Sequence, residues 1–286
     1  MAAQLRACAR LMRIVNSLMV GFAVLVGIAI VVGRDIVNLP LTTLVLAYVT
    51  GFTISASSMV LNDIVDIDID RINAPDRPLV SGAVSLRTAY ACYAILSLLG
   101  VIASLLIGWE ALAVAVAGWL VGSLYDVWGK RSGFPGNVMV AFSTSLPFPY
   151  AMAVVEAWRE STIIFWAMVF LTVLGREIVK DIADVEGDRH VNARTLPIVI
   201  GEGPSAVIAA ILYVVAVALS PIPVIIGGVE PVSYGVFIAV VDFILLYESI
   251  RIVKDHSRAT ALRHKRNVLI AMLLGLIGFM LGTLLG

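Results

Sequence analysis

The chain has 286 residues, of which 60% are hydrophobic and 14% are charged. A soluble domain has about 45–50% apolar and about 25% charged residues, so this composition predicts a polytopic membrane protein. The formal net charge is zero, which gives no support to a nucleic-acid partner.

The N-terminal stretch, MAAQLRACARLMRIVN, is basic and amphipathic and runs directly into an apolar segment. It predicts an interfacial helix that leads into an uncleaved first span. The two cysteines, Cys8 and Cys92, have no metal-binding or redox spacing, and we expect unpaired thiols.

Nine apolar runs of about membrane-spanning length follow one another along the chain. Backbone groups in lipid must be paired within their own segment, so each run is predicted to be a helix. The predicted fold class is therefore all-α, with one polytopic domain over residues 1–286. The predicted spans are 14–33, 39–61, 87–108, 110–125, 136–155, 161–177, 204–227, 231–253 and 266–285.

Lysines and arginines are unevenly distributed between the two sides of this nine-span arrangement. Of the 20, 18 lie on the side of the N-terminus, and only Arg34 and Arg159 lie on the other. The positive-inside rule then places the N-terminus in the cytoplasm and the C-terminus outside a cell membrane. The gaps after the second and sixth spans share the cytoplasmic side, so their acidic residues can line one chamber.

Five aspartates are concentrated in NDIVDIDIDRINAPDRPLVSG, residues 62–82, between two apolar spans. Asp63, Asp66 and Asp70 are spaced i, i+3, i+7, which places them within about 60° of one another on a helix. Asn62, Asp66 and Asp70 form a stripe that is almost as narrow. The spacing therefore leaves open whether Asn62 or Asp63 faces inward, while Asp68 lies on another face.

A second acidic stretch, REIVKDIADVEGDR at 176–189, repeats this spacing in Asp181, Asp184 and Asp188. Carboxylates on one helical face repel each other unless cations neutralise them. One such cluster could be a salt-bridged surface. Two clusters with the same spacing, both at the cytoplasmic end of a helix bundle, favour the binding of a hard divalent cation. Oxygen ligands suit Mg²⁺, which shares its coordination shell with water and phosphate.

Basic residues flank both acidic stretches, as expected for a phosphorylated ligand that metal and guanidinium groups hold together. A third cytoplasmic gap, residues 124–137, adds Tyr125 and further cations, which could equally be interfacial anchors. The basic candidates are Arg71, Arg77, Lys130, Arg131, Lys180, Arg189 and Arg194.

These residues carry a family resemblance. The Asn62–Asp70 stretch followed by NAPDRPLVSG resembles the first motif of the UbiA superfamily of intramembrane prenyltransferases, and REIVKDIADVEGDR…TLPIVIG resembles the second. RIVNSLM resembles the first-helix stretch, with Asn16 at its polar position, and YDVWGKR resembles the third-loop motif. Many relatives space the tyrosine and lysine of that loop by three residues, whereas Tyr125 and Lys130 have four between them.

The resemblance covers most of the chain and implies a nine-helix bundle with cytoplasmic cap segments. It also implies Mg²⁺-dependent transfer of a prenyl group from an isoprenyl diphosphate. The implied metal ligands are Asn62, Asp63, Asp66, Asp70, Asp181, Asp184 and Asp188. The implied catalytic residues are Asp66, Asp70, Asp184, Asp188, Tyr125 and Lys130, and the implied substrate contacts are Asn16, Arg71, Arg77, Lys130, Arg131, Lys180, Arg189 and Arg194.

Within the superfamily, these motif sequences are most similar to those of the branch that makes archaeal ether lipids. There, geranylgeranyl diphosphate alkylates the hydroxyl of geranylgeranylglyceryl phosphate, so the expected partners are an isoprenyl diphosphate, a lipid-like acceptor and membrane lipid. Aromatic, quinone-precursor or tetrapyrrole acceptors are the alternative. An ion-coupled transporter is a remoter one, because acids inside membranes mark ion pathways, but these carboxylates cluster at helix ends.

Several further side chains have expected roles. Asp126 could take the acceptor's proton or orient Lys130, and Asp242, inside an apolar span, is expected to pair with Tyr247 or a nearby backbone amide. The candidates for the wall of a prenyl-tail groove are Phe142, Phe148, Tyr150 and Trp166.

Overall fold

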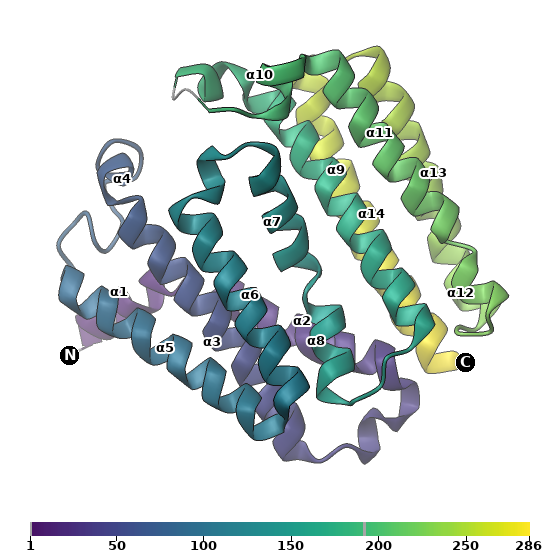
Figure 1. Ribbon diagram of the computed structural model, residues 1–286, viewed down its shortest axis with the longest axis horizontal. Coiled ribbons are helices and arrows are strands. Elements are labelled where there is room, and N and C mark those ends of the chain that lie inside the picture. The colour runs from purple at the N-terminus through teal and green to yellow at the C-terminus, as the bar shows by residue number, and fades with distance from the viewer. Residues whose placement is uncertain (1, 191–192) are drawn as a thin grey trace.

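A computed structural model describes residues 2–190 and 193–286, and throughout these ranges the regular elements are helices, with no strand (Figure 1). The predicted all-α fold class is confirmed. The helices are α1 Ala2–Leu11, α2 Ile14–Val32, the 3-10 helix η1 Gly33–Asn38, α3 Leu41–Val65, α4 Ile67–Asn73, α5 Leu86–Ile107, α6 Trp109–Val127, the 3-10 helix η2 Gly129–Arg131, α7 Phe134–Ser145, α8 Pro147–Val154, α9 Glu160–His190, α10 Leu196–Ile200, α11 Glu202–Leu219, α12 Ile222–Ile225, α13 Pro231–Lys254 and α14 Arg258–Leu285.

Seven helical segments of the described chain are long and apolar enough to cross a membrane. Two of the nine predicted spans are not among them. The segment 136–155 is divided between α7 and α8, and Pro147 begins α8 because proline cannot continue the hydrogen bonding of the preceding helix. The segment 231–253 lies within α13. The seven are Ile14–Asn38, Leu41–Val65, Leu86–Ile107, Trp109–Val127, Glu160–Arg189, Glu202–Ile225 and Arg258–Leu285.

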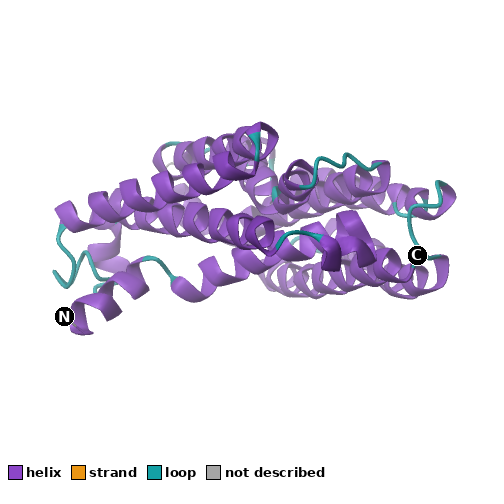
Figure 2. Ribbon diagram, turned by 90° about the horizontal axis from the view of Figure 1, so that it is seen from below, coloured by secondary structure: helices purple, strands orange, loops and turns teal. Residues whose placement is uncertain are grey.

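Small residues let the long helices approach closely, as is usual where lipid offers no hydrophobic driving force. A Cβ on Gly100 of α5 would lie 2.8 Å from Thr53 of α3. A Cβ on Gly175 of α9 would lie 2.9 Å from the ring of Tyr213 in α11. Figure 2 shows the resulting bundle from below, with helices packed across its full width.

The acidic residue inside α13, Asp242, has a partner from another segment. Asp242 accepts a hydrogen bond from Ser220 Oγ at 2.6 Å, so the expected pairing with Tyr247 or a backbone amide is wrong. The partner lies in the cap that follows α11, a tertiary contact that the α13 sequence does not contain. Both cysteines are free, as expected.

The two acidic motifs lie at the carboxyl ends of two helices. The first motif ends α3, where Asp66 is the C-cap, and continues into α4. The second occupies the last turns of α9, which runs unbroken to His190. Figure 1 shows α4 and α10 at the same end of the bundle. Because a helix carboxyl end carries partial negative charge, aspartates there need compensating cations.

Candidate active site

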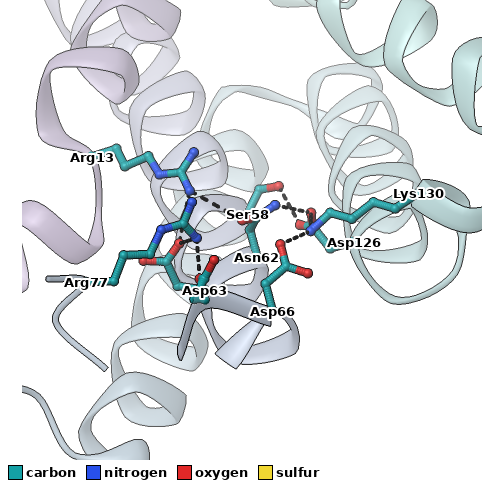
Figure 3. A network of polar contacts seen from close by, with 9 residues as sticks. Arg13, Ser58, Asn62, Asp63, Asp66, Arg77, Asp126 and Lys130 are labelled. Carbon is teal, nitrogen blue, oxygen red and sulfur yellow. Dashed lines mark hydrogen bonds and ion pairs between the residues drawn. The ribbon is translucent and has the colours of Figure 1, made fainter. Parts of the chain in front are cut away.

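Asp63, in the last turn of α3, is only 3% exposed and lies between two guanidinium groups. Arg13 Nη2 and Arg77 Nη1 are each 3.0 Å from the same oxygen, Oδ1 of Asp63 (Figure 3). Arg77 also pairs with Asp70 in α4. The two buried carboxylates are thus neutralised by arginines from both flanking segments.

The neighbouring residues of the first motif face a different partner, Lys130 of η2. Lys130 Nζ is 2.7 Å from Asp66 and 3.5 Å from Asp126. Asn62 donates to Asp126 at 3.1 Å, and Ser58 donates to its other oxygen at 3.0 Å. Asn62 therefore lies between the two groups, because its amide nitrogen contacts Asp126 and its oxygen accepts from Arg13 at 3.4 Å, whereas Asp63 contacts both arginines (Figure 3).

The second motif is built on α9. Asp181 is 8% exposed and accepts a hydrogen bond from Asn137 of α7 at 2.8 Å. Glu177, one turn earlier, binds Arg176 at 2.8 Å and Lys180 at 2.9 Å. This arrangement holds the lysine at the mouth of the site. Further along, Asp184, Arg189 and Arg194 are exposed and Asp188 is half-buried.

The segment from Tyr125 to Asn137 contacts both motifs. Lys130 binds the first motif and Asn137 donates to Asp181 of the second, while Tyr125 lies in the last turn of α6. Gly133 has φ +71°, and a Cβ there would lie 1.9 Å from the carbonyl oxygen of Arg194, so the contact needs glycine. The structure thus brings the third cytoplasmic gap between the two acidic clusters.

Other predicted residues lie apart from these contacts. Asn16 is exposed on α2, and Arg71 binds Asp68 at 2.8 Å with both side chains largely exposed. The side chain of Arg131 lies outside the described residues. Within the described chain, no group of three or more histidine, cysteine or acidic side chains could by itself hold a metal ion.

Two apolar cavities lie below the polar site. One, of about 470 Å³, reaches Ser58 and Tyr150, and the other, of about 520 Å³, is lined by Phe148. Phe142 and Trp166 line neither cavity, and Trp166 instead donates to Ser145 at 3.0 Å. The two cavities share the wall residues Met19, Ala23, Thr144 and Pro147.

Four residues of this site were not predicted: Arg13, Ser58, Asn137 and Glu177. Ser58 and Asn62 are four residues apart, so their shared helical face was a usable signal in an otherwise apolar span. Glu177 lies one turn before Asp181 on the same helix. Arg13 and Asn137 had no comparable signal, because their partners come from distant helices.

A profile of the UbiA prenyltransferase family matches residues 20–277. The chain belongs to the UbiA prenyltransferase family. The resemblance of the two aspartate motifs is thereby confirmed at the level of the family.

The similarity to individual relatives extends over nearly the whole length of the chain. The digeranylgeranylglyceryl phosphate synthase of Archaeoglobus fulgidus is 38% identical over 283 residues, covering 98% of this chain and 96% of the relative. A solved structure of a digeranylgeranylglyceryl phosphate synthase superposes with a TM-score of 0.91 at 32% identity, covering 99% of both chains. A UbiA homolog from Archaeoglobus fulgidus bound to GPP and Mg²⁺ has the same fold, with a TM-score of 0.70 at 18% identity over 96% of this chain and 99% of that one.

Proposed function

We propose that this UbiA protein transfers a geranylgeranyl group from geranylgeranyl diphosphate to the hydroxyl of geranylgeranylglyceryl phosphate and releases diphosphate. The observation that carries the proposal is that one segment, residues 125–137, contacts both aspartate motifs, through Lys130 and Asn137, next to apolar cavities. The names of the full-length relatives favour this acceptor over aromatic or tetrapyrrole acceptors.

The donor atoms at this site fit Mg²⁺. They are carboxylate and amide oxygens from Asn62, Asp66, Asp70, Asp181, Asp184 and Asp188, with no nitrogen or sulfur ligand among them. Mg²⁺ in proteins takes one or two carboxylates and completes its shell with water and substrate phosphate, so a cage of three protein acids is not required. We assign Asn62 in preference to Asp63, because the amide nitrogen of Asn62 contacts Asp126, whereas Asp63 contacts both arginines. The bound metal would supply charge stabilisation for the diphosphate leaving group.

Lys130 and Lys180 are the cations that we assign to the diphosphate. Each is held by a buried acid beside it, Lys130 by Asp126 and Lys180 by Glu177. Cations fixed in advance stabilise the negative charge that grows on the diphosphate as its bond to the prenyl carbon breaks. Asp126 already accepts hydrogen bonds from Ser58 and Asn62, so we assign it to the positioning of Lys130 and not to proton transfer.

Water must be kept from the allylic carbocation that this bond breaking produces. The apolar cavities below the carboxylates provide such surroundings for the prenyl carbon and its tail. The ether bond then forms from the acceptor's hydroxyl oxygen, and the hydroxyl proton is released. The active site therefore needs a polar mouth and a dry interior, which this bundle combines.

We further propose one nine-span domain over residues 1–286, with the N-terminus and the active site in the cytoplasm and the C-terminus outside. The α7–α8 pair and α13 would provide the two spans beyond the seven long apolar segments. The distribution of charge supports this orientation, because Arg34 and Arg159 line one cavity of about 600 Å³ at the end of the bundle that is remote from both motifs. Protease or cysteine-labelling accessibility at the two termini tests it.

The function is tested by incubating the purified protein with geranylgeranyl diphosphate, Mg²⁺ and a panel of acceptors, followed by mass spectrometry. We expect the ether product from geranylgeranylglyceryl phosphate, with stoichiometric release of diphosphate. Alkylation of aromatic acids alone would overturn the acceptor. Substrate-dependent flux in proteoliposomes without diphosphate release would instead support a transporter.

A further inference from the structure

We propose that Arg13 and Arg77 form a separate anion site for the phosphate group of the lipid acceptor. This inference rests on the proposed function and names the acceptor's own subsite. It assigns Arg77 to the acceptor, in place of the donor's diphosphate that the family resemblance suggested.

The two guanidinium groups have unused hydrogen-bonding capacity. Arg13 contacts Asn62 and Asp63 through Nη2 alone, and Arg77 contacts Asp63 and Asp70 through Nη1 alone. No further hydrogen bond from either guanidinium is found in the described part of the chain. An arginine presents five N–H donors in a planar fork that matches phosphate oxygens, so each side chain can bind another anion without leaving its aspartate.

The arginines are also accessible. Their side chains are 34% and 31% exposed, whereas the Asp63 carboxylate between them is 4% exposed. The carboxylate thus fixes the pair from the buried side and leaves the outer edges open. Arg10, near the end of α1, adds a third guanidinium, which donates to the backbone oxygen of Asp76 at 2.8 Å.

The two arginines contact the first motif from the side opposite Lys130. Figure 3 shows Arg13 and Arg77 on one side of Asn62 and Asp63, and Lys130 and Asp126 on the other. A diphosphate held by both acidic motifs would lie on the Lys130 side, because the segment that follows Lys130 reaches Asp181 of α9 through Asn137. The arginine side remains for a second anionic group.

The backbone at Arg13 supports a dedicated role. Arg13 has φ 43° and ψ 56°, a left-handed conformation that is uncommon for a residue with a side chain. This conformation ends α1 and starts α2. From Arg13, α2 runs down along the cavity of about 470 Å³, which Met19, Val20, Ala23 and Val24 line. A phosphate at Arg13 therefore has an apolar wall for its attached chain directly beneath it.

The test compares geranylgeranylglyceryl phosphate with phosphate-free geranylgeranylglycerol as acceptors for Arg13→Gln and wild type. We expect the variant's kcat/KM for the phosphate-bearing acceptor to fall by about 10- to 100-fold, as for the loss of a charge-assisted contact. The variant's kcat/KM for geranylgeranylglycerol and its KM for geranylgeranyl diphosphate should stay within about twofold of wild type. Arg13→Lys should restore part of the preference. The matched control is Arg6→Gln, which replaces an exposed arginine of the preceding helix α1.

Equal losses with both acceptors, or a raised Mg²⁺ requirement, would show that Arg13 only neutralises Asp63 and would overturn the inference. If Arg13→Gln does not fold, Arg77→Gln gives the same comparison. Wild-type protein that alkylates neither acceptor would overturn the proposed function, and the inference with it. Wild-type activity combined with unchanged acceptor preference in the variants would overturn the inference alone.

Discussion

Lys130 Nζ lies 2.7 Å from Asp66 Oδ2, which joins side chains that are 64 positions apart in the chain. The pair connects η2 to the first acidic motif, while the same loop contacts the second motif through Gly133 and Asn137. The loop is therefore the structural link between two acid clusters that each sit at a helix end. It also places a cation beside the carboxylates that we assign to the metal.

Replacement of Lys130 by methionine should lower kcat by about 10²–10³-fold, the usual loss when one preorganised electrostatic contact to a leaving group is removed. Steady-state measurement of diphosphate release with saturating donor reports this value. Lys254→Met, at the exposed end of α13, should retain wild-type activity. An active Lys130→Met enzyme would remove this lysine from our proposed diphosphate site.

The two aspartates Asp66 and Asp68 offer a matched comparison within the first motif. Asp66 faces Lys130, whereas the Asp68 side chain is 83% exposed and pairs with the exposed Arg71 at 2.8 Å. We expect Asp66→Asn to raise the Mg²⁺ concentration for half-maximal activity by at least about tenfold, in line with the loss of a carboxylate ligand. Titration of activity with Mg²⁺ measures the shift. Asp68→Asn should give the wild-type curve, and equal shifts in both variants would indicate a general electrostatic effect of the cluster.

The sequence predicted the fold class and the candidate residues because both depend on local patterns. Apolar runs marked the helices, and the i, i+3, i+7 spacing marked the carboxylates. The division of 136–155 at Leu146 was missed, since a hydropathy pattern does not register the break before Pro147. The choice between Asn62 and Asp63 needed Arg13 and Lys130, which approach from distant segments.

Gly133→Ala should reduce activity and lower stability by about 1–3 kcal/mol or more, because the residue has a positive φ and a Cβ would meet the Arg194 carbonyl oxygen at 1.9 Å. Thermal melting in detergent and the activity assay measure the two effects. Gly235→Ala in α13 is the control: no atom lies within 4 Å of its Cβ position, and alanine in a helix gains about 0.5–1 kcal/mol over glycine. Similar melting temperatures for both variants would contradict the tight contact at Gly133.

A buried polar chain joins α11, α13 and α14, which pack beside α9, the helix of the second motif. Tyr213 in α11 and His264 in α14 are 2.9 Å apart, and His264 Nδ1 lies 3.4 Å from Glu248 in α13. All three side chains are at most 1% exposed, and the Tyr213 ring packs against α9 at Gly175.

His264→Ala should destabilise the protein by about 3–5 kcal/mol, because it leaves a buried carboxylate and a buried hydroxyl without this partner. Thermal melting measures the loss, and Ser205→Ala on α11, which removes a local hydroxyl bond to Gly201, should cost only about 1 kcal/mol. Glu248→Gln should lie between them, since an amide can still accept the 2.7 Å hydrogen bond from Asn267. A His264→Ala protein as stable as wild type would show that the helices α9, α11, α13 and α14 are held by apolar packing alone.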